Sequence, residues 1–366
     1  MSGLAAQVGY AKETTAGVPV APSLYLPFEP GESMDGKVER LDSDSIISGQ
    51  RVRRSTQWQS GGEDVAGDVT NELYREDMGL LAEAWLGGVS GGTYTPGALS
   101  YFTVQKGVPV SMTTVPPFTY SGAMCGGWAV GFAAGETVKA TTSWVGGKEI
   151  GHRTVTDGAT NTNTTVTSAT AVFSADDIGK PISGTGIPAA TTISAVASAT
   201  SVTISAAATA TATGVTLTIG TALGSPSYTS GNRPFTYIHG SISLAGSTIG
   251  TVKSGSIGGD NKLVDDRKFV GSRWMYAREG ADLREYGGEL EVEFADRTQY
   301  DRYRRGDELA LVVAFAVGSD SATFTANIRL EGETPKVGSK GLVMQKLPYT
   351  CIGSTTDASA LTLVLV

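Results

Sequence analysis

The sequence has few of the residues on which most enzyme sites depend. Its 366 residues include two histidines, His152 and His239, and neither has a cysteine or carboxylate at metal-ligand spacing. A zinc site and a histidine-based triad are therefore disfavoured. Paired acids such as Asp176-Asp177 could suit a glycan hydrolase, but an acidic β protein offers such pairs by chance. We expect no enzyme, no metal and no cofactor.

Long apolar runs, an export signal and a surplus of basic residues are also missing. The best apolar run, Leu309 to Val317, is far shorter than the roughly 18 residues that span a bilayer. Met1 to Gln7 lacks the basic start and apolar stretch of a signal peptide, so we expect a cytoplasmic chain with reduced, buried Cys125 and Cys351. The formal net charge of −8 argues against tight binding to nucleic-acid phosphates.

Two distant seven-residue segments share one pattern. They are Gly67-Asp68-Val69-Thr70-Asn71-Glu72-Leu73 and Gly288-Glu289-Leu290-Glu291-Val292-Glu293-Phe294. After the glycine, apolar side chains alternate with polar or acidic ones, which is the period of a strand with one buried and one wet face. Carboxylates that share a face repel one another, so we expect the polar face to stay exposed to water.

The similarity continues on both sides of these segments and predicts a β unit that is present twice. Tryptophans precede both copies, in Gln57-Trp58 and Arg273-Trp274, and a short covering helix is predicted after each, at Arg75 to Leu86 and Asp296 to Arg305. Three further segments are paired by their order: Tyr101 to Val104 with Thr323 to Ala326, Gly122 to Val130 with Gly341 to Cys351, and Glu136 to Trp144 with Ala360 to Val366.

A different composition separates the two units. From Thr154 to Gly220 the chain is rich in Thr, Ala, Ser, Val and Gly and carries almost no charge. Short β-branched runs between turn residues predict a small β-sandwich inserted into a surface loop. The predicted domains are a first β unit at 1–153, an inserted domain at 154–220 and a second β unit at 221–366.

Several short motifs, in order, resemble the major tail tube proteins of long flexible-tailed bacteriophages. They begin with Val8-Gly9-Tyr10-Ala11-Lys12-Glu13-Thr14-Thr15 and Leu26-Pro27-Phe28-Glu29, and the series continues with Ser225-Pro226-Ser227-Tyr228, Pro234-Phe235-Thr236-Tyr237-Ile238-His239-Gly240, Ile257-Gly258-Gly259-Asp260-Asn261 and the strand from Gly288 to Phe294. The resemblance covers about four-fifths of the chain and both of its ends.

The resemblance implies a mainly β tail-tube fold whose subunits assemble into rings, and the rings into a hollow tube for the genome. Neighbouring sheets then join edge to edge into a lumen barrel. With two units in one chain, a trimer would make a ring with pseudo-sixfold symmetry, although hexameric rings are the alternative. The implied partners are the chain itself, a tape measure protein in the lumen, tail terminator and tip proteins, and double-stranded DNA in transit. The implied location is the virion tail, assembled in the host cytoplasm.

Two sets of residues are candidates for roles in such a tube. The lumen-lining candidates are Asp68, Thr70, Glu72, Glu289, Glu291 and Glu293. The inter-ring candidates lie on two loops of mixed charge, and they are Asp42, Asp44, Arg51, Arg53, Arg54, Asp265, Asp266, Arg267, Lys268 and Arg273. The competing hypothesis is a stand-alone β-rich adhesin or glycan-binding module, for which the inserted domain is the best argument.

Overall fold

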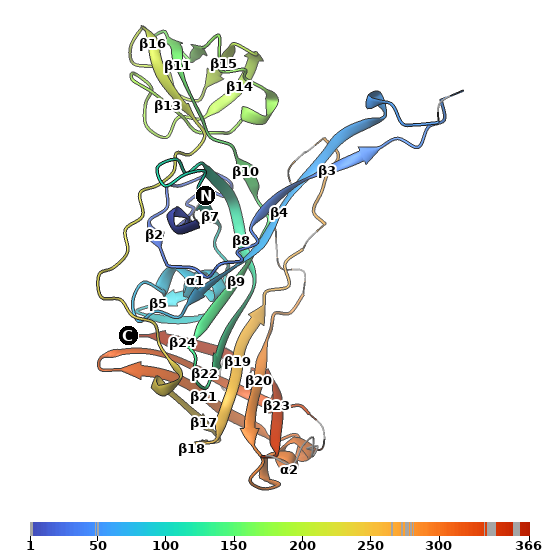
Figure 1. Cartoon of the computed structure of the whole chain (residues 1–366), viewed down its shortest axis with the longest axis vertical. Helices are drawn as coiled ribbons and strands as arrows, with labels where there is room; N and C mark the ends of the chain where they lie inside the picture. Colours follow the sequence, from blue (N-terminus) through green and yellow to red (C-terminus); the bar gives the residue numbers. More distant parts are fainter. Residues whose placement is uncertain are drawn as a thin grey trace. The chain divides into compact units, whose positions relative to one another are not determined.

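The computed structural model describes residues 3–47, 49, 51–264, 266–271, 274, 278, 280, 282–332, 334, 342–353 and 359–366. The protein is mainly β, as the sequence predicts (Figure 1), and the strand pairings in its sheets are antiparallel. The chain forms two compact units. Unit 1 contains residues 1–25, 101–123 and 147–227, and unit 2 contains residues 26–100, 124–146 and 228–366. The three-domain division by sequence stays a prediction.

The first sheet of unit 1 has the order β2-β1-β7-β8-β10. Its strands are β1 (Gln7–Lys12), β2 (Leu24–Tyr25), β7 (Phe102–Gly107), the first part of β8 (Pro117–Ala133) and β10 (Lys148–Ile150), preceded by the 3-10 turn η1 (Gly3–Ala5). The carboxylate of Glu13, at the end of β1, is buried and accepts hydrogen bonds from two hydroxyls and two backbone amides, those of Thr103, Ser121, Gly17 and Gly122. This network ties the loop after β1 to β7 and β8.

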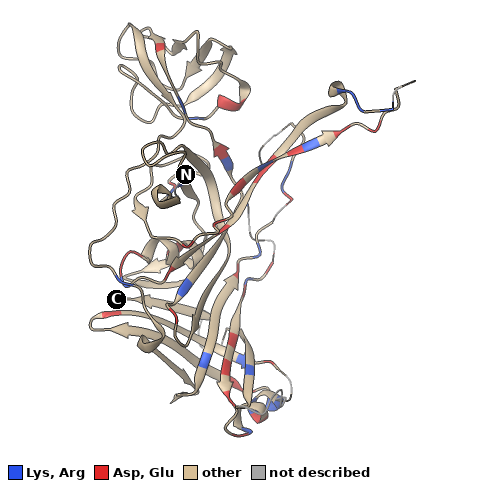
Figure 2. Cartoon of the chain, viewed as in Figure 1, with Lys and Arg blue, Asp and Glu red and all other residues tan. Residues whose placement is uncertain are grey.

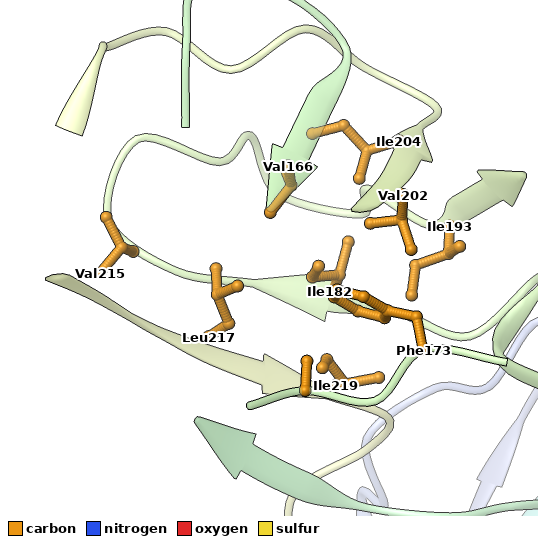
Figure 3. Close-up of a cluster of buried hydrophobic side chains, with 10 residues drawn as sticks. Val166, Phe173, Ile182, Ile193, Val202, Ile204, Val215, Leu217 and Ile219 are labelled. Carbon is orange, nitrogen blue, oxygen red and sulfur yellow. The ribbon is translucent and has the colours of Figure 1, made fainter. Parts of the chain in front are cut away.

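The second sheet of unit 1 lies within the predicted insertion and has the order β13-β16-β11-β12-β15-β14. Its strands are β11 (Arg153–Thr160), β12 (Thr165–Thr167), β13 (Ile182–Ser183), β14 (Ile193–Ser198), β15 (Ser201–Ile204) and β16 (Ala212–Ile219). A bridge between Pro181 and Thr192 joins its two edges, so the sheet closes on itself. Its aliphatic side chains and Phe173 point inward and form one apolar cluster (Figure 3).

One buried carboxylate holds the base of this small sheet together. Asp177, in the 3-10 turn η3 (Ala175–Asp177), has a 1% exposed side chain. The two terminal nitrogens of the Arg153 guanidinium donate to it, at 2.9 and 2.6 Å, and Lys180 donates at 2.9 Å. Burial alone would raise the pKa of Asp177, but the hydrogen bonds from Arg153 and Lys180 outweigh it and lower that pKa to about 2.

The long sheet of unit 2 has the order β3-β4-β9-β8-β19-β20-β23-β22-β21-β17-β18. Its first strands are β3 (Asp35–Asp42), β4 (Trp58–Glu72), β9 (Lys139–Val145) and the second part of β8. The rest are β17 (Gly240–Leu244), β18 (Ser247–Thr248), β19 (Val252–Asp260), β20 (Glu285–Glu293), β21 (Glu308–Val317), β22 (Asp320–Leu330) and β23 (Met344–Cys351). A branch leaves β22 through β24 (Leu361–Leu365), β6 (Thr93–Pro96) and β5 (Gly87–Ser90). Two 3-10 turns, η2 (Ser55–Gln57) and η4 (Tyr237–His239), precede β4 and β17.

The two described α-helices differ in how much they bury. In α1 (Gly79–Leu86), Trp85 is fully buried, stacks on Trp128 at 5.2 Å and donates its indole N–H to Thr142 at 2.8 Å. The helix therefore covers β8 and β9, as expected. In α2 (Thr298–Arg305) no residue is buried, so the second helix contributes little to the core. Its charged sequence explains this, because it lacks the apolar stripe of α1.

The strand pairings repeat in the same order in both halves of the chain. The first half pairs β2-β1-β7-β8-β9-β4-β3, and the second pairs β18-β17-β21-β22-β23-β20-β19. In addition, β8 pairs with β10 as β22 pairs with β24. The register agrees as well: Gly67 faces Trp144 and Gly288 faces Tyr349. We call the two halves repeat 1 and repeat 2.

The repeats align differently from the pairing predicted for segments after the helices. Tyr101 to Val104 lies on β7, whose equivalent is β21, whereas Thr323 to Ala326 lies on β22. The two later predicted pairs are also wrong by one strand. Repeat 1 has a hairpin, β5–β6, directly after its helix, and repeat 2 has no equivalent of it among the described residues. The cysteines are therefore not equivalent: Cys125 lies on β8 and matches Leu330, while Cys351 lies on β23. Both thiols are buried and free.

Candidate functional site

All six lumen-lining candidates lie on one face of one continuous part of the unit 2 sheet. The segment β4-β9-β8-β19-β20-β23 runs without a break from repeat 1 to repeat 2. Residues opposite one another on antiparallel strands point to the same face. Rows of opposite residues therefore connect the candidates across the sheet, and one row is Glu72, Lys139, Gly131, Ser256 and Glu289.

We call this surface the acidic face. Its charged members are Asp68, Glu72, Lys139, Asp260, Glu285, Glu289, Glu291, Glu293 and Lys346. None of these is buried, whereas the alternate positions Val69, Leu290 and Val292 are. The alternation predicted from sequence is thus confirmed for both strands.

Most carboxylates of the acidic face lie in two rows, which we call rails, and Asp260 on β19 lies beside the second row. One rail lies on β4 and the other on β20, and β9, β8 and β19 separate them. Four strand steps of about 4.8 Å place the rails about 19 Å apart. Between them β8 contributes only Gly127, Ala129, Gly131 and Ala133 to this face. The middle of the strip therefore carries no polar or charged side chain on this face, and the cation at its side, Lys139 on β9, pairs with Glu29.

Lysines neutralise part of the acidic face. Lys346 pairs with Glu289 at 2.9 Å, and Lys139 pairs with Glu29 at 2.7 Å. Hydrogen bonds from these lysines to Glu289 and Glu29 raise the pKa of both ammonium groups. Glu291 instead accepts a hydrogen bond from the Ser254 hydroxyl at 2.9 Å. The charges of both signs along β20 and β23 are visible in Figure 2, and acids outnumber lysines on this face.

The opposite face of the same strands forms the core of unit 2. Val130, Ile257, Leu290 and Leu347 are buried in it, and Trp128 stacks between Trp85 at 5.2 Å and Phe324 at 6.1 Å. Because one face is fixed by this packing, a register slip would expose every apolar side chain, so the orientation of the acidic face is specified.

The inter-ring candidates lie on two loops that are equivalent in the repeats. Residues 43–57 connect β3 to β4, and residues 261–284 connect β19 to β20. Since β4 and β20 run in the same direction, both loops leave the sheet at the same end. Asp265 and Arg273 lie outside the described residues.

The β3–β4 hairpin with its connecting loop, residues 35–66, is exposed along much of its length; we call it the arm. The side chains of Ile46 and Val52 are 95% and 77% exposed at its tip. Arg53 pairs with Asp42 at 2.7 Å and Asp44 at 2.6 Å, so these three candidates stabilise the arm itself. Arg51 and Arg54 are exposed beside them.

The second loop is tied to the arm by ion pairs. Lys268 lies 3.5 Å from Glu39, and Arg278, whose side chain is 6% exposed, pairs with Asp64 at 2.9 Å. Asp266 and Arg267 belong to the same stretch. The two loops together present a surface of mixed charge at one end of the sheet.

Sequence reasoning missed several members of the acidic face. Asp260 and Glu285 face each other across β19 and β20, and Lys262 pairs with both, at 3.0 and 2.9 Å. Lys139 and Lys346 were also missed. Only the strand register shows that these residues share a face, and a single sequence does not contain the register. Asp260 does belong to one of the motifs that carry the family resemblance.

Nothing in the described part of the chain suggests chemistry. No group of three or more potential metal ligands occurs among the described residues. Neither described α-helix is long and apolar enough to cross a membrane. Two cavities of about 370 and 250 Å³ lie beside β17 and β18, and neither is lined by a cysteine or a histidine.

Comparison with known proteins gives the family. A family profile described as phage tail tube protein matches the chain twice, over residues 3–236 and 192–351. The search of curated proteins found no match. The two profile matches agree with the duplicated strand pairings, and together they extend over nearly the whole sequence. The chain belongs to the phage tail tube protein family, which is a structural family and not an enzyme family.

Proposed function

We propose that this chain polymerises into stacked rings that form the hollow tail tube, a passive, acidic-lined conduit for DNA ejection. The observation that carries the proposal is the acidic face, to which both repeats contribute one rail on a single sheet. DNA carries one charge per about 1.7 Å of helix axis, so a basic lining would bind many phosphates at once. An acidic and hydrated lining keeps the duplex free to move.

We propose further that three chains form one ring. Each repeat contributes four strands to the lumen sheet, which are β3, β4, β9 and β8 or their equivalents β19, β20, β23 and β22. Six repeats would close a barrel of roughly 24 strands, and barrels of 16–18 strands already leave an aqueous channel. Rings of six chains are the alternative, and mass measurement of a single ring distinguishes the two.

The arm and the 261–284 loop are the proposed contacts to the next ring. Both leave the sheet at one end, and the arm exposes Ile46 and Val52, which gain from burial against another protein. A contact between two different surfaces of identical chains gives a ring when its rotation closes and a filament when it does not, and contacts between stacked rings are of the second kind. The lumen would hold a tape measure protein during assembly, and the tube ends would meet the terminator and tip proteins of the virion tail.

Electron microscopy of the purified protein in negative stain tests the proposal directly. We expect stacked rings or hollow tubes of uniform width. A protein that stays monomeric at every concentration would contradict the proposal and would favour the stand-alone adhesin or glycan-binding module.

The role of the acidic face is tested with one charge reversal. Glu291→Lys adds a cation to each β20 rail, and we expect assembled tubes of this variant to retain duplex DNA at low salt and release it as salt rises. Asp176→Lys, on η3 outside the acidic face, is the matched control and is expected to behave as the wild type. Equal DNA retention by both variants would show that position 291 does not face the lumen.

A further inference from the structure

Strand β1 is buried on both faces, although its equivalent in repeat 2 is not. All residues of β1 from Gln7 to Ala11 are buried, whereas β17 is buried only at Ile242 and Leu244. An antiparallel strand that carries a polar side chain on one face is usually wet on that face, so the burial of β1 requires a cover. Part of the cover is the segment 221–227, which leaves the closed sheet of residues 153–219 and which we call the strap.

Two buried glutamines hold the strap. Gln7 on β1 and Gln105 on β7 are 7% and 1% exposed. The Gln7 amide donates to the Gly224 carbonyl at 2.7 Å. The Gln105 amide donates to the Ala222 carbonyl at 2.9 Å and accepts a hydrogen bond from the Gly224 N–H at 2.9 Å. Removal of the strap would leave these buried amides without partners, which is unfavourable, so the contact is fixed.

The two glutamines have no equivalents in repeat 2. The registers of β7 with β8 and of β21 with β22 make Gln105 equivalent to Val312, and the registers of β1 with β7 and of β17 with β21 make Gln7 equivalent to Ser241. Ser241 is exposed and Val312 is only partly buried. The buried amides therefore occur in the repeat that carries the closed sheet and not in the other.

The chain enters and leaves the closed sheet at one narrow point. Gly151 lies between β10 and β11, Gly220 directly follows β16, and a side chain on Gly220 would meet the Gly151 carbonyl. The two connections thus lie side by side. The strap that continues from Gly220 reads Thr-Ala-Leu-Gly-Ser-Pro-Ser, and a segment with so many small residues is flexible unless it is anchored.

Gln105 links the anchors of both connections. On the entry side, β10 pairs with β8, where Ile150 faces Thr119. Gln105 faces the same threonine from β7 and donates to its hydroxyl at 2.9 Å. The Gln105 amide therefore binds the strand that anchors the entry and, through Ala222, the strap that forms the exit.

We infer that Gln7 and Gln105 form a clamp that fixes the strap and thereby holds the closed sheet in one orientation relative to the first sheet of unit 1. The closed sheet is then a rigid projection of unit 1 and not a domain on a flexible tether. A surface held in this way loses less conformational freedom when it binds a partner. The clamp acts within one chain, so this inference does not depend on the proposed function.

A distance measurement between the two sheets tests the inference. Spin labels are attached at Lys12→Cys on β1 and Thr165→Cys on β12, because both residues are exposed on strands. Double electron–electron resonance gives the distribution of distances between the labels, and dilution with unlabelled protein restricts it to distances within one chain. Protein without the added cysteines shows whether the buried Cys125 and Cys351 take up label.

We expect a single narrow distribution in this labelled background. Gln105→Leu keeps the size of the side chain and removes its three hydrogen bonds, so the distribution should become at least twice as wide. Gly224→Val acts from the other side, because a side chain at 224 meets the Tyr25 hydroxyl and displaces the strap, and the same broadening is expected. Gln59→Leu, at an exposed glutamine of β4, is the matched control and should leave the width unchanged.

All distances are measured well below the unfolding temperature of each variant, which separates release of the strap from general destabilisation. A labelled background as broad as the variants would overturn the inference, because the closed sheet would then move in spite of the clamp. Narrow distributions in both Gln105→Leu and Gly224→Val would also overturn it, because something other than the clamp would then fix the orientation. Should Gln105→Leu fail to fold, the result for Gly224→Val decides alone.

Discussion

Replacement of Asp177 by Asn is expected to loosen the small sheet of unit 1. The Asp177 side chain is 1% exposed and accepts hydrogen bonds from Arg153 and Lys180. Asn keeps the shape of the side chain and removes its charge. The two cations then remain partly buried without their counter-ion, which destabilises the folded state.

The magnitude follows from the pKa. A carboxyl lowered from 3.8 to about 2 by these partners contributes about 2.4 kcal/mol at neutral pH. Because the folded pKa lies below the unfolded one, the contribution is complete above about pH 4 and is lost as pH falls toward 2. At neutral pH, Asp177→Asn should therefore make local opening about 60-fold more frequent.

Hydrogen exchange of the intact protein, followed by mass spectrometry on peptides from β11 and β16, measures this opening. Asp176→Asn is the matched control, because Asp176 is the exposed neighbouring carboxylate and its loss should change exchange by less than about threefold. After correction for intrinsic exchange, the 60-fold difference should shrink as the pH approaches 2. A difference between wild type and Asp177→Asn that does not depend on pH would refute the electrostatic reasoning.

Three further perturbations have defined outcomes. Trp85→Ala removes a buried stacked ring and a hydrogen bond to Thr142, so the free energy of unfolding measured by thermal melting should fall by about 3–5 kcal/mol. Trp58→Ala is the control, because Trp58 is 46% exposed and its loss should lower that free energy only slightly. Glu13→Gln puts the N–H groups of an amide where the carboxylate accepts hydrogen bonds from four donors, so we expect the unfolding temperature to fall by several degrees. An unchanged unfolding temperature would contradict this hydrogen-bond network. Deletion of residues 154–219 should leave tubes visible in negative stain, and their disappearance would count against a peripheral position for this sheet.

Local patterns in the sequence were sufficient for the strands that carry the acidic face. Glycine followed by alternating polar and apolar residues predicted β4 and β20, because period two is fixed by strand geometry. The first covering helix was predicted at Arg75 to Leu86 and is found as α1 (Gly79–Leu86), with Leu81 and Trp85 fully buried. In the insertion, short β-branched runs predicted strands, and β15 (Ser201–Ile204) is one of them.

Long-range register was not available from one sequence. The predicted alignment of the two repeats was therefore wrong by one strand after α1, because the β5–β6 hairpin of repeat 1 has no counterpart among the described residues of repeat 2. Lys346 and Glu289 are 57 residues apart in sequence and meet only because β20 pairs with β23. The family resemblance supplied what pattern alone could not, which is the expectation of a tube wall.

The closed sheet of residues 153–219 has a consequence for imaging. It occurs once in each chain, whereas the acidic strands occur twice. In a ring of three chains the bore would repeat every 60°, but this sheet would appear only every 120°. Reconstructions averaged with sixfold symmetry would sharpen β4 and β20 and smear the small sheet to half weight, whereas threefold averaging would recover both.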